Sequence, residues 1–147
     1  EYTLRIDQRR GTTVEQTWDV PIEVGPEGDA PLLQIDRAAC SAESCLLQGW
    51  ALDPQSADGA GIGHVHVWAQ KTSGCLGAEE SRFLGAADLG VTRPDVAQRY
   101  GAQFGSAGYS LSVPALAKGE WLVTVYAWSV RTGRWDIAKQ MVVTSDR

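Results

Sequence analysis

The stretch Trp121-Leu-Val-Thr-Val-Tyr-Ala-Trp-Ser-Val130 is rich in β-branched and aromatic residues. This composition is typical of a β-strand. Successive side chains of a strand point to opposite faces of its sheet, so the alternation places Val123 and Val125 on one face and Thr124 on the other. We expect the valines to face a core and Thr124 to face outward.

A second strand is predicted at Gly63-His-Val-His-Val-Trp-Ala-Gln70, where the two kinds of side chain alternate strictly. Val65 and Val67 share one face with an alanine, whereas His66 and Trp68 lie on the other face with a second histidine. The pattern predicts a strand with one buried and one outward face.

Further strand patterns occur at residues 32–37, 45–53, 82–89, 108–113 and 135–144. Turn-forming pairs such as Asp58-Gly59 and Lys118-Gly119 separate them. A chain of about seven short strands separated by turns predicts an all-β sandwich. The stretch 93–100 has proline near its start and glycine just after it, which predicts one short helical crossover.

The first thirty or so residues are set apart from the sandwich by a linker. Residues 2–8 and 14–24 read as two strands of a hairpin, and residues 25–31 carry glycine and proline. We therefore divide the chain into a hairpin with its linker, 1–31, and a sandwich, 32–147. A lone hairpin is marginally stable in water. It is either the tail of an upstream domain, or it packs on the sandwich of its own molecule or of a second copy in a swapped dimer.

Several local patterns occur together in the sandwich region: Gly49-Trp-Ala-Leu-Asp53, Gly63-His-Val-His-Val-Trp-Ala69, Phe83-Leu-Gly-Ala86, Arg93-Pro-Asp-Val-Ala97, Ser106-Ala-Gly-Tyr-Ser110 and Gly119-Glu-Trp-Leu-Val-Thr-Val-Tyr-Ala127. In this order they resemble the bacterial immunoglobulin-like domains that are repeated or appended in large exported proteins. The resemblance covers residues 32–145. It implies an immunoglobulin-like sandwich that serves as a structural or adhesion module, with neighbouring domains of the same polypeptide as partners.

The composition of the chain indicates which partners it can bind and where it is located. The formal net charge is −5, and the densest basic spot is Arg9-Arg10, too little to follow a phosphate backbone. No apolar run approaches the ~18 residues of a membrane span. We expect neither nucleic-acid binding nor membrane insertion, and no cofactor. No charged-then-apolar leader opens the sequence, so we expect any export signal outside it and an extracellular or cell-surface location.

The cysteines offer one local pairing. Cys40 and Cys45 bracket Ser-Ala-Glu-Ser, a polar stretch that a turn can close. We expect a disulfide between them, which agrees with an exported protein. Reduced thiols, or a bridge to Cys75, are the alternatives.

Two weak metal patterns occur. His64 and His66 share a strand face, a spacing that some zinc sites use, but no third ligand lies nearby. Asp53 and Asp58 lie in a loop whose oxygens suit a hard cation, without the alternating acids of an EF-hand. An ordinary Asp-Gly turn explains the same loop. We therefore expect no metal site and keep Asp53 and Asp58 as weak candidates.

No motif indicates catalysis. A Gly-x-Ser-x-Gly elbow is absent from the sequence, and neither histidine has the context of a catalytic triad. Paired carboxylates for glycoside hydrolysis depend on a separation in space that sequence does not give. We expect no enzyme activity, with a metal-dependent enzyme as a remote alternative.

The aromatic residues provide the candidate binding site. If the two strands above are neighbours in an immunoglobulin-like sheet, an outward patch forms from His66, Trp68, Tyr126 and Trp128. The N-terminal hairpin with Trp18, or a neighbouring domain, covers the patch on one hypothesis. On the other, the patch binds a glycan or a protein ligand. If the ligand is a glycan, the chain is a carbohydrate-binding module, and we expect at least two exposed, coplanar rings beside polar side chains. On a third hypothesis the facing of the two strands is the reverse, so that these aromatic residues point toward the core.

Overall fold

The structure is a computed structural model that describes residues 2–10, 13–22, 30–72 and 81–146, with side chains from residue 30 on. The chain divides into two units, Glu1–Ala30 and Pro31–Arg147. The first contains strands β1 (Tyr2–Arg10) and β2 (Thr13–Ile22). They pair as an antiparallel hairpin in which Ile6 lies opposite Trp18. The hairpin predicted from the sequence is therefore present.

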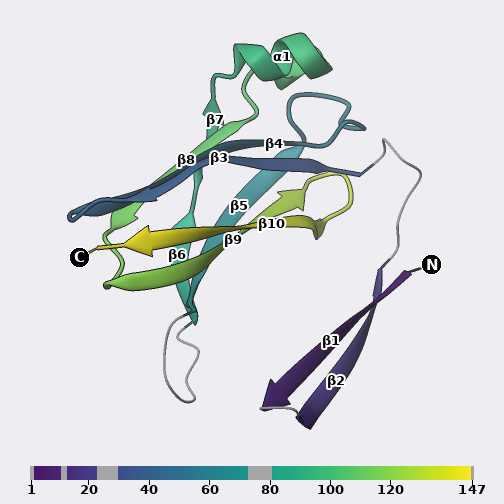
Figure 1. Ribbon diagram of the computed structural model, residues 1–147. Coiled ribbons are helices and arrows are strands. Elements are labelled where there is room, and N and C mark those ends of the chain that lie inside the picture. Colours follow the sequence, from purple (N-terminus) through teal and green to yellow (C-terminus); the bar gives the residue numbers. More distant parts are fainter. Residues whose placement is uncertain (1, 11–12, 23–29, 73–80, 147) are drawn as a thin grey trace. The chain divides into compact units, whose positions relative to one another are not determined.

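The second unit is an all-β sandwich of two four-stranded antiparallel sheets, which Figure 1 shows as two layers. One sheet has the order β3-β4-β8-β7, with bounds Leu32–Cys40, Ser44–Leu52, Gly108–Pro114 and Asp88–Val91. The other has the order β10-β9-β5-β6, with bounds Arg134–Ser145, Gly119–Ser129, Ile62–Lys71 and Ser81–Ala86. The sandwich class predicted from the sequence is confirmed.

The single strand predicted at 82–89 is wrong, because the chain changes sheets within it. β6 ends at Ala86 and pairs with β5, whereas β7 begins at Asp88 and pairs with β8. Ala87 between them is buried, and its N–H donates to the carbonyl of Val65. Figure 1 shows the chain running on from one layer to the other here. The sandwich therefore has eight strands in its described part.

The core lies between the two layers. Val65 and Val67 from β5, and Val123 and Val125 from β9, are almost completely buried. Trp121 is also buried, and its indole N–H donates to the carbonyl of Ala117 at 2.9 Å. These positions confirm the predicted facing of both strands, so the residues between them point away from the core.

A smaller apolar cluster lies beside the predicted helix. The expectation that this helix crosses between the sheets is wrong, because it joins β7 to β8, which pair with each other in one sheet. Helix α1 (Pro94–Tyr100) begins with the proline and is followed by Gly101, as the sequence predicts, and a 3-10 turn, Ala102–Phe104, comes next. Val96 and Phe104 pack with Leu52 from β4. In the part of the chain that the structure describes, no helix is long and apolar enough to span a membrane.

The glycine of the Gly49-Trp-Ala-Leu-Asp53 pattern has a packing role. Gly49 lies opposite Tyr109 of β8, whose hydroxyl donates to the carbonyl of Gln34 on β3. A Cβ atom on Gly49 would lie 2.0 Å from that carbonyl oxygen and 2.6 Å from the tyrosine oxygen. Only glycine leaves room for this partly buried hydrogen bond, which spans three strands of the sheet.

Cys40 ends β3 and lies directly opposite Cys45 on β4. The two form the predicted disulfide, with their Cα atoms 4.0 Å apart. Cys75, the third cysteine, lies outside the described residues.

Candidate binding face

Aromatic side chains gather on the outward side of the β10-β9-β5-β6 sheet, which we call the aromatic face. Its members are His64, His66, Trp68, Phe83, Tyr126, Trp128 and Trp135. The register aligns them in rows across the strands. Trp128 lies opposite both His64 and Trp135, Tyr126 lies opposite His66, and Trp68 lies opposite Phe83. The four residues proposed from the sequence, His66, Trp68, Tyr126 and Trp128, therefore lie on one face.

The rings of the aromatic face form an almost continuous chain of contacts. The Trp135 ring reaches over β9 to β5, where its centroid lies 4.5 Å from that of His66. The ring centroids of His66 and Phe83 lie 5.2 Å apart, and those of Phe83 and Trp68 lie 5.1 Å apart. His64 adds contacts to Trp128 and Trp135. Each ring in the chain therefore restricts its neighbour, which favours a preformed surface.

The aromatic face is open within its own unit. Trp68, Phe83, Tyr126 and Trp135 keep 40%, 46%, 38% and 45% of their surface exposed. Rings in contact are inclined to each other by between 41° and 62°. The coplanar rings expected for a carbohydrate-binding face are therefore not found among these contacts, and the surface is uneven where coplanar rings would make it flat.

One recess lies at the Trp68 end of the aromatic face, and we call it the Trp68 hollow. It has a volume of about 280 Å³ and takes residues from all four strands of the sheet. Its walls are formed by Trp68, Tyr126 and Leu122, together with Ala69, Gln70, Ser81, Thr124 and Gln140. The hollow thus combines two aromatic rings with hydroxyl and amide groups, and none of the described residues that line it is charged.

Three members of the aromatic face were not among the four residues proposed from the sequence: His64, Phe83 and Trp135. Irregular pairing explains the last two, since the register of β6 shifts next to Phe83 and that of β10 shifts next to Trp135. Such a shift breaks the alternation from which facing is inferred. The signal that could have found Trp135 was the density of aromatic residues on the neighbouring strand.

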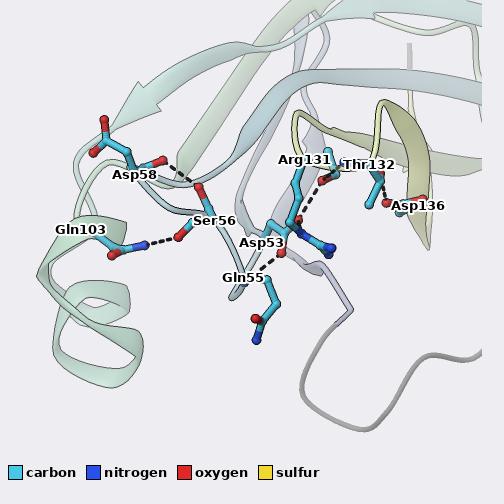
Figure 2. A network of polar contacts seen from close by, with 9 residues as sticks. Asp53, Gln55, Ser56, Asp58, Gln103, Arg131, Thr132 and Asp136 are labelled. Carbon is cyan, nitrogen blue, oxygen red and sulfur yellow. Dashed lines mark hydrogen bonds and ion pairs between the residues drawn. The ribbon is translucent and has the colours of Figure 1, made fainter.

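Asp53 has a structural role in a buried polar network (Figure 2). Its side chain is fully buried, and its Oδ2 accepts hydrogen bonds from the Ser129 hydroxyl at 2.8 Å and the Arg131 Nε at 2.9 Å. The backbone N–H of Gln55 donates to its Oδ1. Burial raises the pKa of Asp53, but the hydrogen bonds from Arg131, Ser129 and Gln55 outweigh it, so the pKa lies below its ordinary value.

The structure does not bring the two weak metal candidates together. Asp58 contributes its backbone carbonyl to the Ser56 hydroxyl, and Figure 2 shows its carboxylate pointing away from Asp53. The Arg131 guanidinium lies against the Asp53 carboxylate, where a cation would have to bind. Within the ranges that the structure describes, no three side chains of the types His, Cys, Asp and Glu come together as a metal-ligand group.

A second hollow lies beside α1 and carries charges. Its volume is about 520 Å³, and Trp50 and Tyr100 line it with their ring centroids 5.4 Å apart. Arg93 donates two hydrogen bonds to Asp95 and one to Asp36. The hydrogen bond from Arg93 lowers the pKa of Asp95 to about 2, and the pairing raises the pKa of Arg93. Arg93 thus links Asp95 in α1 to Asp36 in β3 by two ion pairs.

Comparison with protein-family models, with curated proteins and with solved structures gave no match for this chain. The residues of the aromatic face and their contacts are therefore the basis for a functional assignment.

Proposed function

We propose that the chain is a non-catalytic adhesion module of a larger exported bacterial protein, and that it binds carbohydrate through the aromatic face. The observation that carries the proposal is the chain of ring contacts from Trp135 through His66 and Phe83 to Trp68, exposed across a whole sheet. Exposed aromatic patches of this kind mark binding surfaces on soluble domains.

The strand order supports an immunoglobulin-like module. The orders β3-β4-β8-β7 and β10-β9-β5-β6 correspond to the ABED and GFC sheets of a constant-type immunoglobulin domain, with β6 as an added edge strand. Such domains commonly serve as units of cell-surface proteins. The disulfide between Cys40 and Cys45 is in keeping with an oxidising compartment outside the cytosol.

The polar groups of the aromatic face favour a hydroxyl-rich ligand over an apolar cover. His64, Thr124 and Gln140 lie among the rings, with all or part of each side chain in contact with water. An apolar hairpin or domain packed here would bury these groups, and each one left without a hydrogen bond would cost about 1–3 kcal/mol. A sugar offers hydroxyl groups to the polar side chains and C–H groups to the rings.

His64 and His66 pack among the rings of the aromatic face. We assign both histidines to this binding surface.

Sedimentation with insoluble polysaccharide tests the proposal. The full chain is mixed with cellulose, chitin or purified bacterial cell walls, and the protein left in solution is measured after centrifugation. We expect retention on at least one material without release of soluble sugar. The double variant Trp68→Ala/Trp135→Ala should bind about tenfold more weakly or worse, because it removes two exposed rings.

The control is Leu89→Ala, which truncates a side chain of similar exposure, 42%, on the other sheet. It should bind like the parent. Absence of retention on every material, or equal retention of the double variant, would contradict carbohydrate binding through this face. Release of sugar into solution would contradict the non-catalytic role.

A further inference from the structure

We infer that the Trp68 hollow is the main sugar subsite of the aromatic face and that it selects an uncharged sugar residue. The inference rests on the proposed function and adds the class of ligand and the residues that select it. It follows from the lining of the hollow, from its size and from the charge of the chain.

The lining combines two kinds of contact that a pyranose ring needs. Trp68 and Tyr126 present aromatic surface, which suits the C–H groups on one side of a sugar ring. Thr124 and Gln140 stand across the strands from Trp68 in the same row, so their polar atoms meet the rim of a ring that stacks there. Small-ligand sites typically have this mixture of apolar walls and a few placed polar groups.

The polar groups are already oriented. The Gln140 amide N–H donates to the Thr124 hydroxyl oxygen at 3.1 Å. Neither side chain makes a further polar interaction with the described residues. The amide oxygen of Gln140 remains as an acceptor, and the hydroxyl hydrogen of Thr124 remains as a donor. A sugar hydroxyl both donates and accepts, so one or two adjacent hydroxyl groups satisfy this pair.

Charge and size define the class of sugar. The residues that the structure describes in the lining of the hollow are uncharged, and the chain carries a formal net charge of −5, which repels polyanions. The charged hollow beside α1 shows the contrast, since three acidic or basic side chains there already pair with one another. The volume of about 280 Å³ lies just below the range of about 300–1,000 Å³ for small-ligand sites, which suits a single sugar unit of a chain.

Affinity electrophoresis of the full chain tests the inference. Native gels contain either a neutral polysaccharide (hydroxyethylcellulose, galactomannan or xylan) or an acidic one (polygalacturonate or alginate). We expect at least one neutral polysaccharide to retard the protein and the acidic ones to leave its mobility unchanged. Trp68→Ala should weaken the interaction about tenfold or more, and Gln140→Leu, which keeps the size of the side chain, about threefold or more.

Trp135→Ala is the comparison within the face, because it removes the same ring type with similar exposure outside the hollow. It should weaken binding, but less than Trp68→Ala does. Leu89→Ala, on the other sheet, is the control and should bind like the parent. Thermal unfolding of each variant reports its folding, and Gln140→Leu provides the test if Trp68→Ala does not fold.

The outcomes separate the two proposals. Preference for an acidic polysaccharide, or a larger loss with Trp135→Ala than with Trp68→Ala, overturns the subsite and leaves carbohydrate binding by the face in place. Unchanged binding by folded Gln140→Leu also overturns it. Failure of every neutral and acidic polysaccharide to retard the protein contradicts both the subsite and the proposed function.

Discussion

The Asp53 carboxylate, on the loop after β4, accepts a 2.8 Å hydrogen bond from the Ser129 hydroxyl at the end of β9. These strands belong to different sheets, so the bond joins the two layers at one end of the sandwich. Arg131 completes the pairing from the turn between β9 and β10. The network keeps the loop after β4 and the β9–β10 turn in a fixed relationship.

We predict that Asp53→Asn lowers the free energy of unfolding by about 1–3 kcal/mol, because the amide cannot accept all three hydrogen bonds from buried partners. Asp58→Asn, on the same loop, should change it by less than about 0.5 kcal/mol, since its carboxylate is exposed. Urea unfolding of the two variants provides the comparison. Equal effects would contradict the structural role of Asp53.

The same network predicts a pH dependence. The pKa of Asp53 is lower in the folded chain than its ordinary value of 3.8, so ionised Asp53 contributes its full stabilisation above that pH. The contribution is lost as the pH falls below about 4. The stability difference between the parent and Asp53→Asn should therefore shrink between pH 5 and pH 2, when both are unfolded by urea. If the stability difference stayed constant over this pH range, the lowered pKa of Asp53 in the folded chain would be contradicted.

The assignment of β9 side chains to the core or to the aromatic face can be tested with one substitution on each side of the strand. Val123→Asp should unfold the sandwich, because an unpaired carboxylate in the core costs several kcal/mol, comparable to the total stability. Thr124→Asp, on the aromatic face, should cost less than about 1 kcal/mol. Circular dichroism during thermal unfolding gives both values, and similar damage from the two would contradict the assignment.

Alternation in sequence was enough to predict the facing of β5 and β9, because both strands keep their period of two over most of their length. It was not enough for Trp135. This residue and Ile137 lie two positions apart, but a register shift between them places Trp135 outward while Ile137 packs against the core. A bulge depends on the partner strand, so a single strand pattern does not reveal it.

Sequence patterns also could not predict polar contacts between residues that are far apart in the chain. Asp53 and Arg131 are 78 positions apart, and only the folded arrangement of the two sheets brings them together. The sequence of the loop with Asp53 and Asp58 resembles a cation site because it does not show that Arg131 pairs with Asp53 in the folded chain. The switch from β6 to β7 is similar, because β-propensity within 82–89 carries no information about which sheet each half joins.

The disulfide leads to a prediction for the thiols. Without reductant, Cys40 and Cys45 should resist alkylation while Cys75 is labelled, and peptide mass mapping identifies each site. Reduction should lower stability by about 2 kcal/mol, because the bond closes a short loop. Labelling of both Cys40 and Cys45 in oxidised protein would contradict the bond.

Deletion of residues 1–28 tests whether the hairpin covers the aromatic face. The sequence offers the hairpin as a cover, but the polar groups among the rings favour a free face. We therefore expect the truncated chain, which also lacks Trp18, to show no red shift in the emission of its remaining tryptophans and to keep its thermal midpoint and its binding to neutral polysaccharide. A red shift with a lower midpoint would show that the hairpin packs on the rings, in its own molecule or in a swapped copy.

The central claim is that the aromatic face is the surface that binds sugar, and the indole N–H signals in an NMR titration test it most directly. The titrant is a neutral oligosaccharide prepared from the polysaccharide that retards the full chain most. We predict that the Trp68 signal shifts most and that Trp128 and Trp135 shift less. Trp121 in the core and Trp50 beside α1 should not move. A shift at Trp50 without one at Trp68, or no shift at any indole of the aromatic face, would contradict the claim.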